Sequence, residues 1–135
     1  MASQLKVDTL TGVTTAGSIA VTGEGNSTTT NLQQGLCKAW ASLNDADTSS
    51  PALLDSFNSS GFTDTATGHF KINFTNSFNN NDFATVNSGR HASVDVGAYL
   101  TDQTTSQTKF LGRAYNSNSN TDFNENMCAS MGDLA

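Results

Sequence analysis

The sequence predicts an all-β protein, an antiparallel β-sandwich that follows an extended N-terminal arm rich in Gly and Thr and one short helix. Thr, Ser and Asn supply 50 of the 135 residues; Thr favours strands, whereas Asn and Ser favour turns and caps. Charged residues make up only 13% of the chain, roughly half the value typical of globular proteins. Short alternating runs between polar turns fill the C-terminal part, which favours a sandwich or a short barrel.

Residues 1–29 form the predicted arm, in which few side chains are apolar. Its branched aliphatic residues are Leu5, Val7, Leu10, Val13, Ile19 and Val21. Burying these six side chains does not offset the conformational entropy lost when the segment is ordered. The segment is therefore expected to be a frayed terminus or to order against another chain, as an intermolecular stem or anchoring arm. The alternation at Leu5 and Val7, and again at Ile19 and Val21, suits strands with one buried face.

Residues 30–37 predict a short helix, with Thr30 suited to the N-cap. A longer helix is one interpretation, because apolar residues continue at helical spacing as far as Leu43. The other ends the helix near Cys37, because Gly35 weakens a helix interior by about 1 kcal/mol. Residues 38–44 (KAWASLN) would then form a strand.

Residues 38–135 are predicted to form the β domain. In residues 69–78 (HFKINFTNSF), Phe70, Ile72 and Phe74 alternate with polar residues, as in a half-buried strand. The other predicted strands cover residues 55–62, 83–86, 92–100, 109–115 and 124–132, with Val94 and Val96 on one face. The predicted turns and polar loops cover residues 63–68, 79–82, 101–108 and 116–122.

Charge and hydropathy exclude several classes of partner. The net charge is −6, and the cationic residues are scattered, so nucleic acid and anionic membrane surfaces are not expected partners. No apolar run approaches the ~18 residues of a membrane span, and the N-terminus lacks the pattern of a signal peptide. The cationic residues are Lys6, Lys38, Lys71, Arg90, Lys109 and Arg113.

No motif indicates catalysis, so we expect no enzyme, no catalytic residue, no cofactor-binding residue and no metal site. A nucleophile elbow and a phosphate-binding loop are both missing. His69 and His91 have no local partner at metal-ligand spacing. Asp45 and Asp47 lie in a segment, NDADTSS, that lacks the Gly and the last acidic ligand of a calcium loop. We interpret that segment as a solvated turn.

The remaining carboxylates and the cysteines favour structural roles. No pair of carboxylates can be placed at the separation that a glycosidase requires. Cys37 and Cys128 can form one disulfide in principle, but two small buried thiols are the favoured interpretation for a protein made in a reducing cytosol. The carboxylates with turn-like neighbours are Asp55, Asp64, Asp82 and Asp122.

Three aromatic residues, Phe110, Tyr115 and Phe123, border polar loops. Such residues either close the end of a sandwich or offer a contact surface for carbohydrate or protein. The structural interpretation is favoured for all three.

Several segments together resemble small virion structural proteins and tail-fibre knob segments of tailed, marine-type bacteriophages. The resemblance begins with LKVDTLTGVTTAGSIAVTGEGNSTTTNLQQGLCKAW and continues in LLDSFNSSGFTD, TGHFKINFTNSF and the terminal MGDLA. GNSTTTNLQQGL is its most specific part, and NDADTSSPALLDSFN departs from the family. The stretch after KAW looks like a strand in that family, so the resemblance favours a strand over residues 38–44.

The resemblance implies a non-enzymatic virion surface protein, assembled in the bacterial cytoplasm and forming a homotrimer. Residues 1–29 would attach it to other tail or head proteins, and residues 38–135 would form an exposed knob. The knob would serve host adsorption, through a cell-surface glycan or protein, or decorate the head. Because the chain is short for a fibre, a tip, an adaptor or a head knob fits it. The alternatives are a stand-alone lectin-like carbohydrate-binding protein and a small polysaccharide hydrolase.

Overall fold

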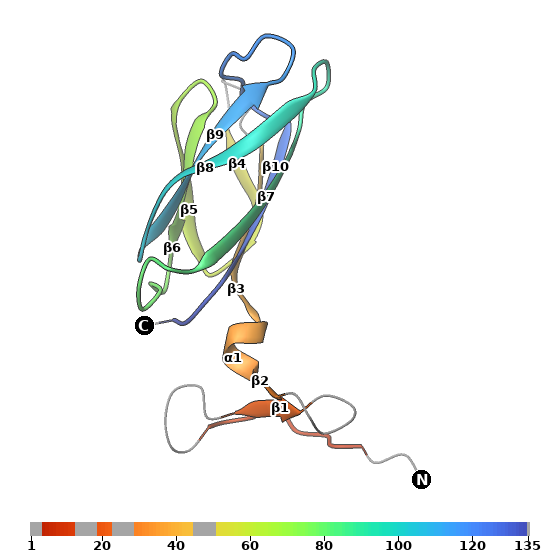
Figure 1. The fold of residues 1–135 in the computed structure, drawn as a ribbon, viewed down its shortest axis with the longest axis vertical. Helices are drawn as coiled ribbons and strands as arrows, with labels where there is room; N and C mark the ends of the chain where they lie inside the picture. The colour runs from red at the N-terminus through yellow and green to blue at the C-terminus, as the bar shows by residue number, and fades with distance from the viewer. Residues whose placement is uncertain (1–3, 13–18, 23–28, 45–50, 135) are drawn as a thin grey trace. The chain divides into compact units, whose positions relative to one another are not determined.

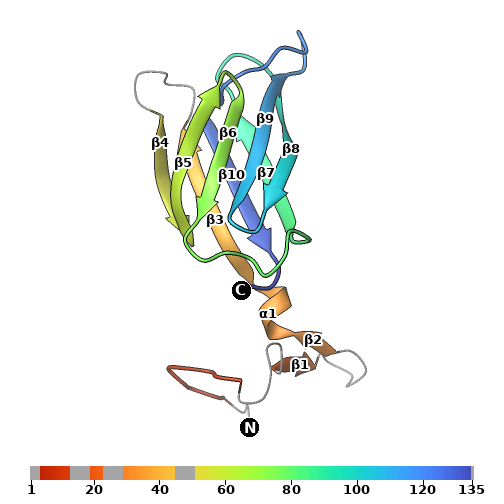
Figure 2. The same ribbon diagram turned by 90° about the vertical axis from the view of Figure 1, so that its left-hand side faces the viewer.

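A computed structural model describes residues 4–12, 19–22, 29–44 and 51–134 of the chain. Figures 1 and 2 show its ribbon from two directions. The chain divides into two compact units, Met1–Gly35 and Leu36–Ala135. We call the second of them the two-sheet unit, and each unit is described by itself.

The N-terminal unit contains two short strands, β1 (Ala20–Thr22) and β2 (Thr29–Asn31), which pair antiparallel. The Leu32 N–H donates to the Ile19 carbonyl at 2.8 Å and extends this pairing by one residue. A strand, β1, thus lies where the alternation of Ile19 and Val21 predicted one, but all three of its residues are exposed, so the predicted buried face is not observed among the described residues.

Residues 4–12 have no regular secondary structure in the single chain, so the strand predicted from Leu5 and Val7 stays a prediction for an assembly with another chain. Leu5, Val7 and Leu10 are all exposed, and Leu5 keeps 82% of its accessible surface. An alternating pair of aliphatic residues makes a strand only where a second surface covers one face. Within the described residues of this chain, these side chains find no such cover.

The helix expected over residues 30–37 is a single turn, α1 (Leu32–Gly35), and strand β3 (Cys37–Asn44) follows almost at once. The prediction of a strand over residues 38–44 is confirmed. Ala39, Ala41 and Leu43 are buried along β3 with more exposed residues between them. A period of two is the strand period, and it prevails over the apolar spacing that suggested a longer helix.

Eight strands of the two-sheet unit form two four-stranded antiparallel sheets, which lie in two layers (Figures 1 and 2). One sheet has the order β4-β3-β10-β7 and the other the order β5-β6-β9-β8. The strands are β4 (Ala52–Phe57), β5 (Ser59–Ala66), β6 (His69–Phe74), β7 (Ala84–Arg90), β8 (Val96–Thr104), β9 (Gln107–Ala114) and β10 (Glu125–Met131).

The core between the sheets combines large side chains from one layer with small ones from the other. β6 and β9 contribute Phe70 and Phe110, which lie directly opposite each other with ring centroids 5.4 Å apart. β3 and β10 contribute mainly small groups, such as Ala41 and Cys128, also opposite each other. Large and small side chains facing one another can interdigitate at native density.

Phenylalanines outside the strands complete this core. Phe78 and Phe83, from the connection between β6 and β7, stack with ring centroids 4.0 Å apart. Phe74 packs edge-on against both rings, and Phe123, before β10, is fully buried. The predicted turn over residues 79–82 is therefore flanked by two residues that hold it onto the core.

Asn58 is the point at which the chain leaves one sheet and enters the other. It separates β4 from β5, with φ of 54°, a left-handed conformation that Asn tolerates better than most residues. Its Oδ1 accepts the Asn76 N–H at 2.7 Å. The prediction of one strand over residues 55–62 is therefore wrong, because Asn58 divides that run between two sheets.

Three further predictions from the sequence are wrong. Residues 63–68 were expected to form a turn, but residues 63–66 belong to β5 and only Thr67 and Gly68 form the turn. Residues 101–108 were expected to form a loop, but only Thr105 and Ser106 form the turn, and the rest extends β8 and β9. Thr108 is fully buried, so a polar side chain occupies an inward position there. Val94 was expected to lie in a strand, but it precedes β8, in a bend.

Gly68 forms the turn between β5 and β6 with φ of +71°. A Cβ at this position would lie 2.6 Å from the Gly112 carbonyl oxygen and 2.8 Å from the Thr121 nitrogen. Both neighbours are backbone atoms, which cannot move aside without shifting β9 or the loop that follows it.

We expect Gly68→Ala to lower the free energy of unfolding by about 2 kcal/mol, because it adds both the strain of the left-handed conformation and a backbone clash. Urea unfolding at equilibrium measures this loss. Gly61→Ala is the matched control, since nothing lies within 4 Å of a Cβ built there, and its effect should stay within about 0.5 kcal/mol. Equal losses for the two variants would contradict this account of Gly68.

Candidate functional site

The outer side of the β4-β3-β10-β7 sheet carries a set of uncovered apolar side chains, which we call the apolar face. Because Ala39, Ala41 and Ser130 point into the core, the residues that alternate with them must point outward. The apolar face comprises Trp40, Phe57, Val86, Met127 and Ala129.

The strand register places the members of the apolar face side by side. Phe57 lies opposite Trp40, Trp40 opposite Ala129, and Ala129 opposite Val86. These four residues form one row across four strands. Met127 belongs to the next row, opposite Ser42 on one side and Ser88 on the other. Directly opposed residues on neighbouring strands are in contact range, so the apolar surface is continuous.

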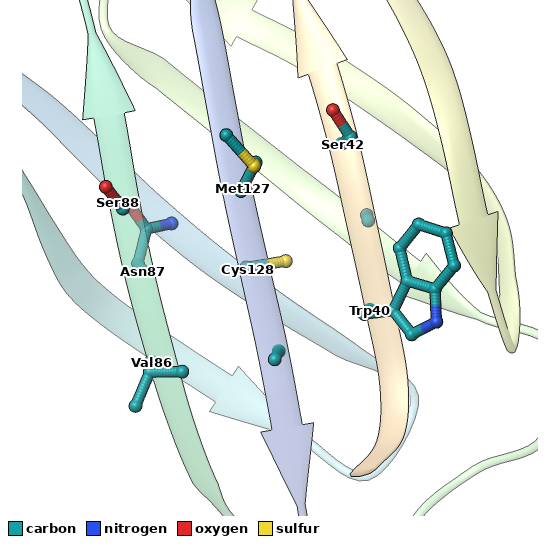
Figure 3. A pocket seen from close by; sticks show the side chains of 9 residues that line it. Trp40, Ser42, Val86, Asn87, Ser88, Met127 and Cys128 are labelled. Atoms are coloured by element: carbon teal, nitrogen blue, oxygen red, sulfur yellow. The ribbon is translucent and has the colours of Figure 1, made fainter.

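A shallow hollow of about 390 Å³ lies over β3, β10 and β7. Figure 3 shows Trp40, Met127 and Val86 projecting from these three strands. The lining is almost wholly apolar, and its outward polar side chains are the hydroxyls of Ser42 and Ser88. A catalytic pocket needs several converging polar groups; this hollow offers an apolar contact surface.

Charged groups lie at the margin of the apolar face. Arg90 and Glu125 face each other at one end of the sheet, with an Nη2–Oε1 distance of 2.9 Å. The hydrogen bond from Arg90, and then its charge, lower the pKa of the Glu125 carboxyl below its usual value. Asp55, on the edge strand β4, accepts the Ser56 N–H at 2.8 Å. Asp55 lies opposite Ser42, so the row that contains Met127 ends in a carboxylate. The row of Phe57, Trp40, Ala129 and Val86 carries no charge.

The two histidines lie apart from each other in the structure. His69 Nε2 is 3.1 Å from the Asn120 amide nitrogen, and His91 Nδ1 accepts the Ser93 N–H at 3.1 Å. In the part of the chain that the structure describes, no three His, Cys, Asp or Glu side chains come together to hold a metal ion.

Of the carboxylates singled out in the sequence, Asp82 and Asp122 lie in loops. Asp55 and Asp64 lie in strands β4 and β5, so the turn-like interpretation is wrong for these two. Asp122 accepts the Gly68 N–H and so joins the β9–β10 loop to the β5–β6 turn. Asp64 and Asp82 are exposed. The predicted solvated turn with Asp45 and Asp47 lies outside the described residues.

The aromatic residues beside the polar loops divide into two groups. Phe110 and Phe123 are fully buried, which confirms the structural interpretation for both. Tyr115 differs, because it remains 64% exposed at the end of β9. For Tyr115 burial does not support the structural interpretation, and the contact surface stays a prediction.

Reasoning from sequence missed the apolar face, although β3 contains a signal for it. In KAWASLN, Trp40 alternates with Ala39 and Ala41, so the largest side chain and the small ones lie on opposite faces. The small residues prove to be the inward ones. When the largest apolar side chain of a strand points away from the core, the strand has a second surface that is suited to contact with another molecule.

Within residues 4–12, 19–22, 29–44 and 51–134, no helix has the length and apolar character needed to cross a membrane. Comparison with protein-family models, with curated proteins and with solved structures gives no match for this chain.

The two cysteines are free thiols in different environments. Cys37 is exposed at the start of β3, whereas Cys128 is buried in β10. Burial raises the pKa of the Cys128 thiol to about 11. Since the thiolate is the reactive form, Cys128 should be inert at neutral pH.

We expect one thiol per native chain to react rapidly with a chromogenic disulfide reagent at neutral pH, and a second to react only after unfolding in guanidinium. Cys37→Ser should remove the rapid reaction of the native chain and leave the reaction seen after unfolding. Cys128→Ala should keep the rapid reaction and remove the one seen after unfolding. Two rapid thiols in the native chain would contradict the burial of Cys128.

Proposed function

We propose that this chain is a non-enzymatic surface protein of a tailed-bacteriophage virion. In this proposal the two-sheet unit is a β-sandwich knob, three copies assemble, and residues 1–29 attach the assembly to tail or head proteins. The knob serves host adsorption or decorates the head. The protein is assembled in the bacterial cytoplasm and functions in the virion.

Uncovered apolar side chains in both units support this proposal. The N-terminal unit exposes Leu5, Val7 and Leu10, and the two-sheet unit exposes the apolar face around a core that is already complete. A small protein that leaves such side chains open in both parts has surfaces suited to contact with other chains. This observation accords with the sequence resemblance to phage knob proteins.

Electrostatics favours the apolar face as the contact between copies. Each chain carries a net charge of −6, so copies repel each other over most of their surface. The row of Phe57, Trp40, Ala129 and Val86 carries no charge, and the Arg90–Glu125 pair beside the apolar face is neutral as a pair. Like-charged copies therefore approach each other at least electrostatic cost through this face.

We expect Met127→Asp to raise the dissociation constant of the trimer at least tenfold, which corresponds to about 1.4 kcal/mol, because it places a carboxylate in the middle of the apolar face. Met127 is 54% exposed, so the monomer should still fold. Sedimentation equilibrium over a range of concentrations measures the constant, and circular dichroism checks the fold.

Tyr99→Asp is the matched control, since Tyr99 is exposed on β8 in the other sheet and should leave assembly unchanged. A wild-type chain that is monomeric at every concentration would contradict the trimer. A stable trimer of the Met127→Asp variant would show that copies meet elsewhere.

Immunogold labelling of intact virions tests the proposal as a whole, using an antibody against residues 51–134. Gold confined to the tail supports a role in adsorption, and gold spread over the head supports decoration. Virions that carry a chain lacking residues 2–29 should lose the label if the arm is the attachment. Absence of gold from purified virions of the parent phage would overturn the virion proposal.

The second candidate is a stand-alone lectin-like carbohydrate-binding protein. The observation that favours it is the exposed ring of Tyr115 beside a polar hollow. Glycan binding by a monomer that is absent from virions would place this candidate first.

A further inference from the structure

A hollow of about 450 Å³ lies at one end of the two-sheet unit, beside the edge strands β7 and β8. Arg90 and His91, at the end of β7, form one side of it. Asp95, before β8, and Tyr115, after β9, form another. This volume falls in the range of small-molecule sites.

Tyr115 offers an exposed aromatic surface with a fixed position. Its N–H donates to the Asp95 carbonyl at 2.9 Å, and its ring lies against the backbone of Gly97. A Cβ at Gly97 would come within 2.8 Å of Tyr115 Cζ, so a side chain there would displace the ring. The glycine thus allows the ring to rest on the sheet, while 64% of the residue stays exposed.

Polar groups around the ring are available to a ligand. No hydrogen bond or ion pair engages the Asp95 carboxylate among the described residues. His91 Nδ1 accepts the Ser93 N–H, so the neutral ring carries its proton on Nε2, which is left to donate. The hollow therefore presents one carboxylate acceptor and one imidazole donor near the aromatic ring.

The charges around the hollow argue against an anionic ligand. Arg90 is engaged by Glu125 through two hydrogen bonds, of 2.9 and 3.3 Å, so its charge is compensated. Asp95 adds a negative charge without a cationic partner among the described residues. A phosphate or an acidic sugar would meet repulsion here, whereas a neutral polyol would not.

A second polar hollow, of about 340 Å³ on the outer side of β6 and β9, provides a contrast. Several of its polar groups are occupied: Lys109 Nζ is 2.7 Å from Asp102, and the Thr101 hydroxyl donates to the Lys109 carbonyl at 3.2 Å. The Thr65 hydroxyl likewise donates to the His69 carbonyl. Among the described residues, the ammonium of Lys71 is left without a partner in this second hollow, whereas the hollow beside Tyr115 leaves the carboxylate of Asp95 without one.

The hollow beside Tyr115 and the start of β3 lie at opposite ends of the two-sheet unit. β10 begins at Glu125, opposite Arg90, and ends at Met131, opposite Cys37 at the start of β3. Leu134, the penultimate residue of the chain, pairs with Phe78 near the end at which β3 begins. In Figures 1 and 2 the β7–β8 and β9–β10 connections lie together, away from the end at which β3 begins.

From this combination we infer that the hollow binds a neutral carbohydrate, with one pyranose ring stacked on Tyr115. The faces of a pyranose carry C–H groups that pack on an aromatic ring, while its hydroxyls point outward toward groups such as Asp95 and His91. The Asp95 carboxylate accepts hydroxyl protons in charge-assisted hydrogen bonds. This inference names a ligand class for host adsorption, but it rests on the hollow alone and holds whether or not the chain belongs to a virion.

The test is a two-dimensional ¹H–¹⁵N NMR titration of the full chain with the methyl glycosides of glucose, mannose and galactose and with N-acetylglucosamine. A site for a single ring should show a dissociation constant on the order of 1 mM for at least one sugar. The shifted signals should cluster at residues 90–97 and 115. Sialic acid and inorganic phosphate, as anionic probes, should not shift these signals.

Variants separate the stacked ring from its hydroxyl. Tyr115→Ala should weaken binding at least tenfold, and Tyr115→Phe should retain most of it because the face of the ring is preserved. Tyr99→Ala is the matched control, since Tyr99 is exposed but does not line the hollow. Asp95→Asn should weaken binding severalfold by removing the charge-assisted acceptor.

Absence of a shift with all four neutral sugars, or shifts centred away from Tyr115, would overturn the inference. Undiminished binding by Tyr115→Ala would also overturn it, as would a site that responds only to the anionic probes. Because the titration uses the isolated chain, its failure would leave the virion proposal standing. Immunogold labelling, in turn, leaves the carbohydrate inference untouched.

Discussion

The two-sheet unit depends on the packing of large side chains from one sheet against small ones from the other. Phe70 and Phe110 fill the space over β6 and β9, and the small residues Ala39 and Ala41 of β3 belong to the same buried cluster. Inward and outward positions alternate along β3, so the strand contributes Ala39 and Ala41 to the core and Trp40 to the apolar face.

The sequence predicts those parts of the fold in which period-two alternation and turn chemistry agree. Phe70, Ile72 and Phe74 predict β6 correctly, and the strand over residues 38–44 is predicted once its alternation is preferred to helical spacing. Prediction fails where polar residues occupy inward positions. The buried Thr108 lies in a run that reads as a loop, because β-structure there depends on pairing with β6 and β8 and not on local preference.

The candidate surfaces are harder to predict than the strands, since both depend on contacts between residues far apart in sequence. The row from Phe57 to Val86 exists only in the assembled sheet register. Likewise, the position of the Tyr115 ring depends on Gly97 on the neighbouring strand. A sequence shows that an aromatic residue borders a polar loop, but it does not show whether the ring closes the core, as Phe123 does, or stays open to solvent, as Tyr115 does. Both rings lie against glycines of neighbouring strands, so the difference depends on the assembled fold.

Hydrogen bonds within the β9–β10 loop and to its neighbours form a framework that holds the loop in place. The Asn118 N–H donates to the Ala114 carbonyl at 2.9 Å, the Ala114 N–H donates to the Ser119 carbonyl at 3.0 Å, and Asp122 ties the end of the loop to Gly68. Most of these bonds join backbone groups, so they survive when exposed side chains are exchanged. Mutations at positions such as Asn116 and Ser117 can therefore alter what this end of the unit contacts while the frame persists, which would let a lineage change its binding preference without first losing stability.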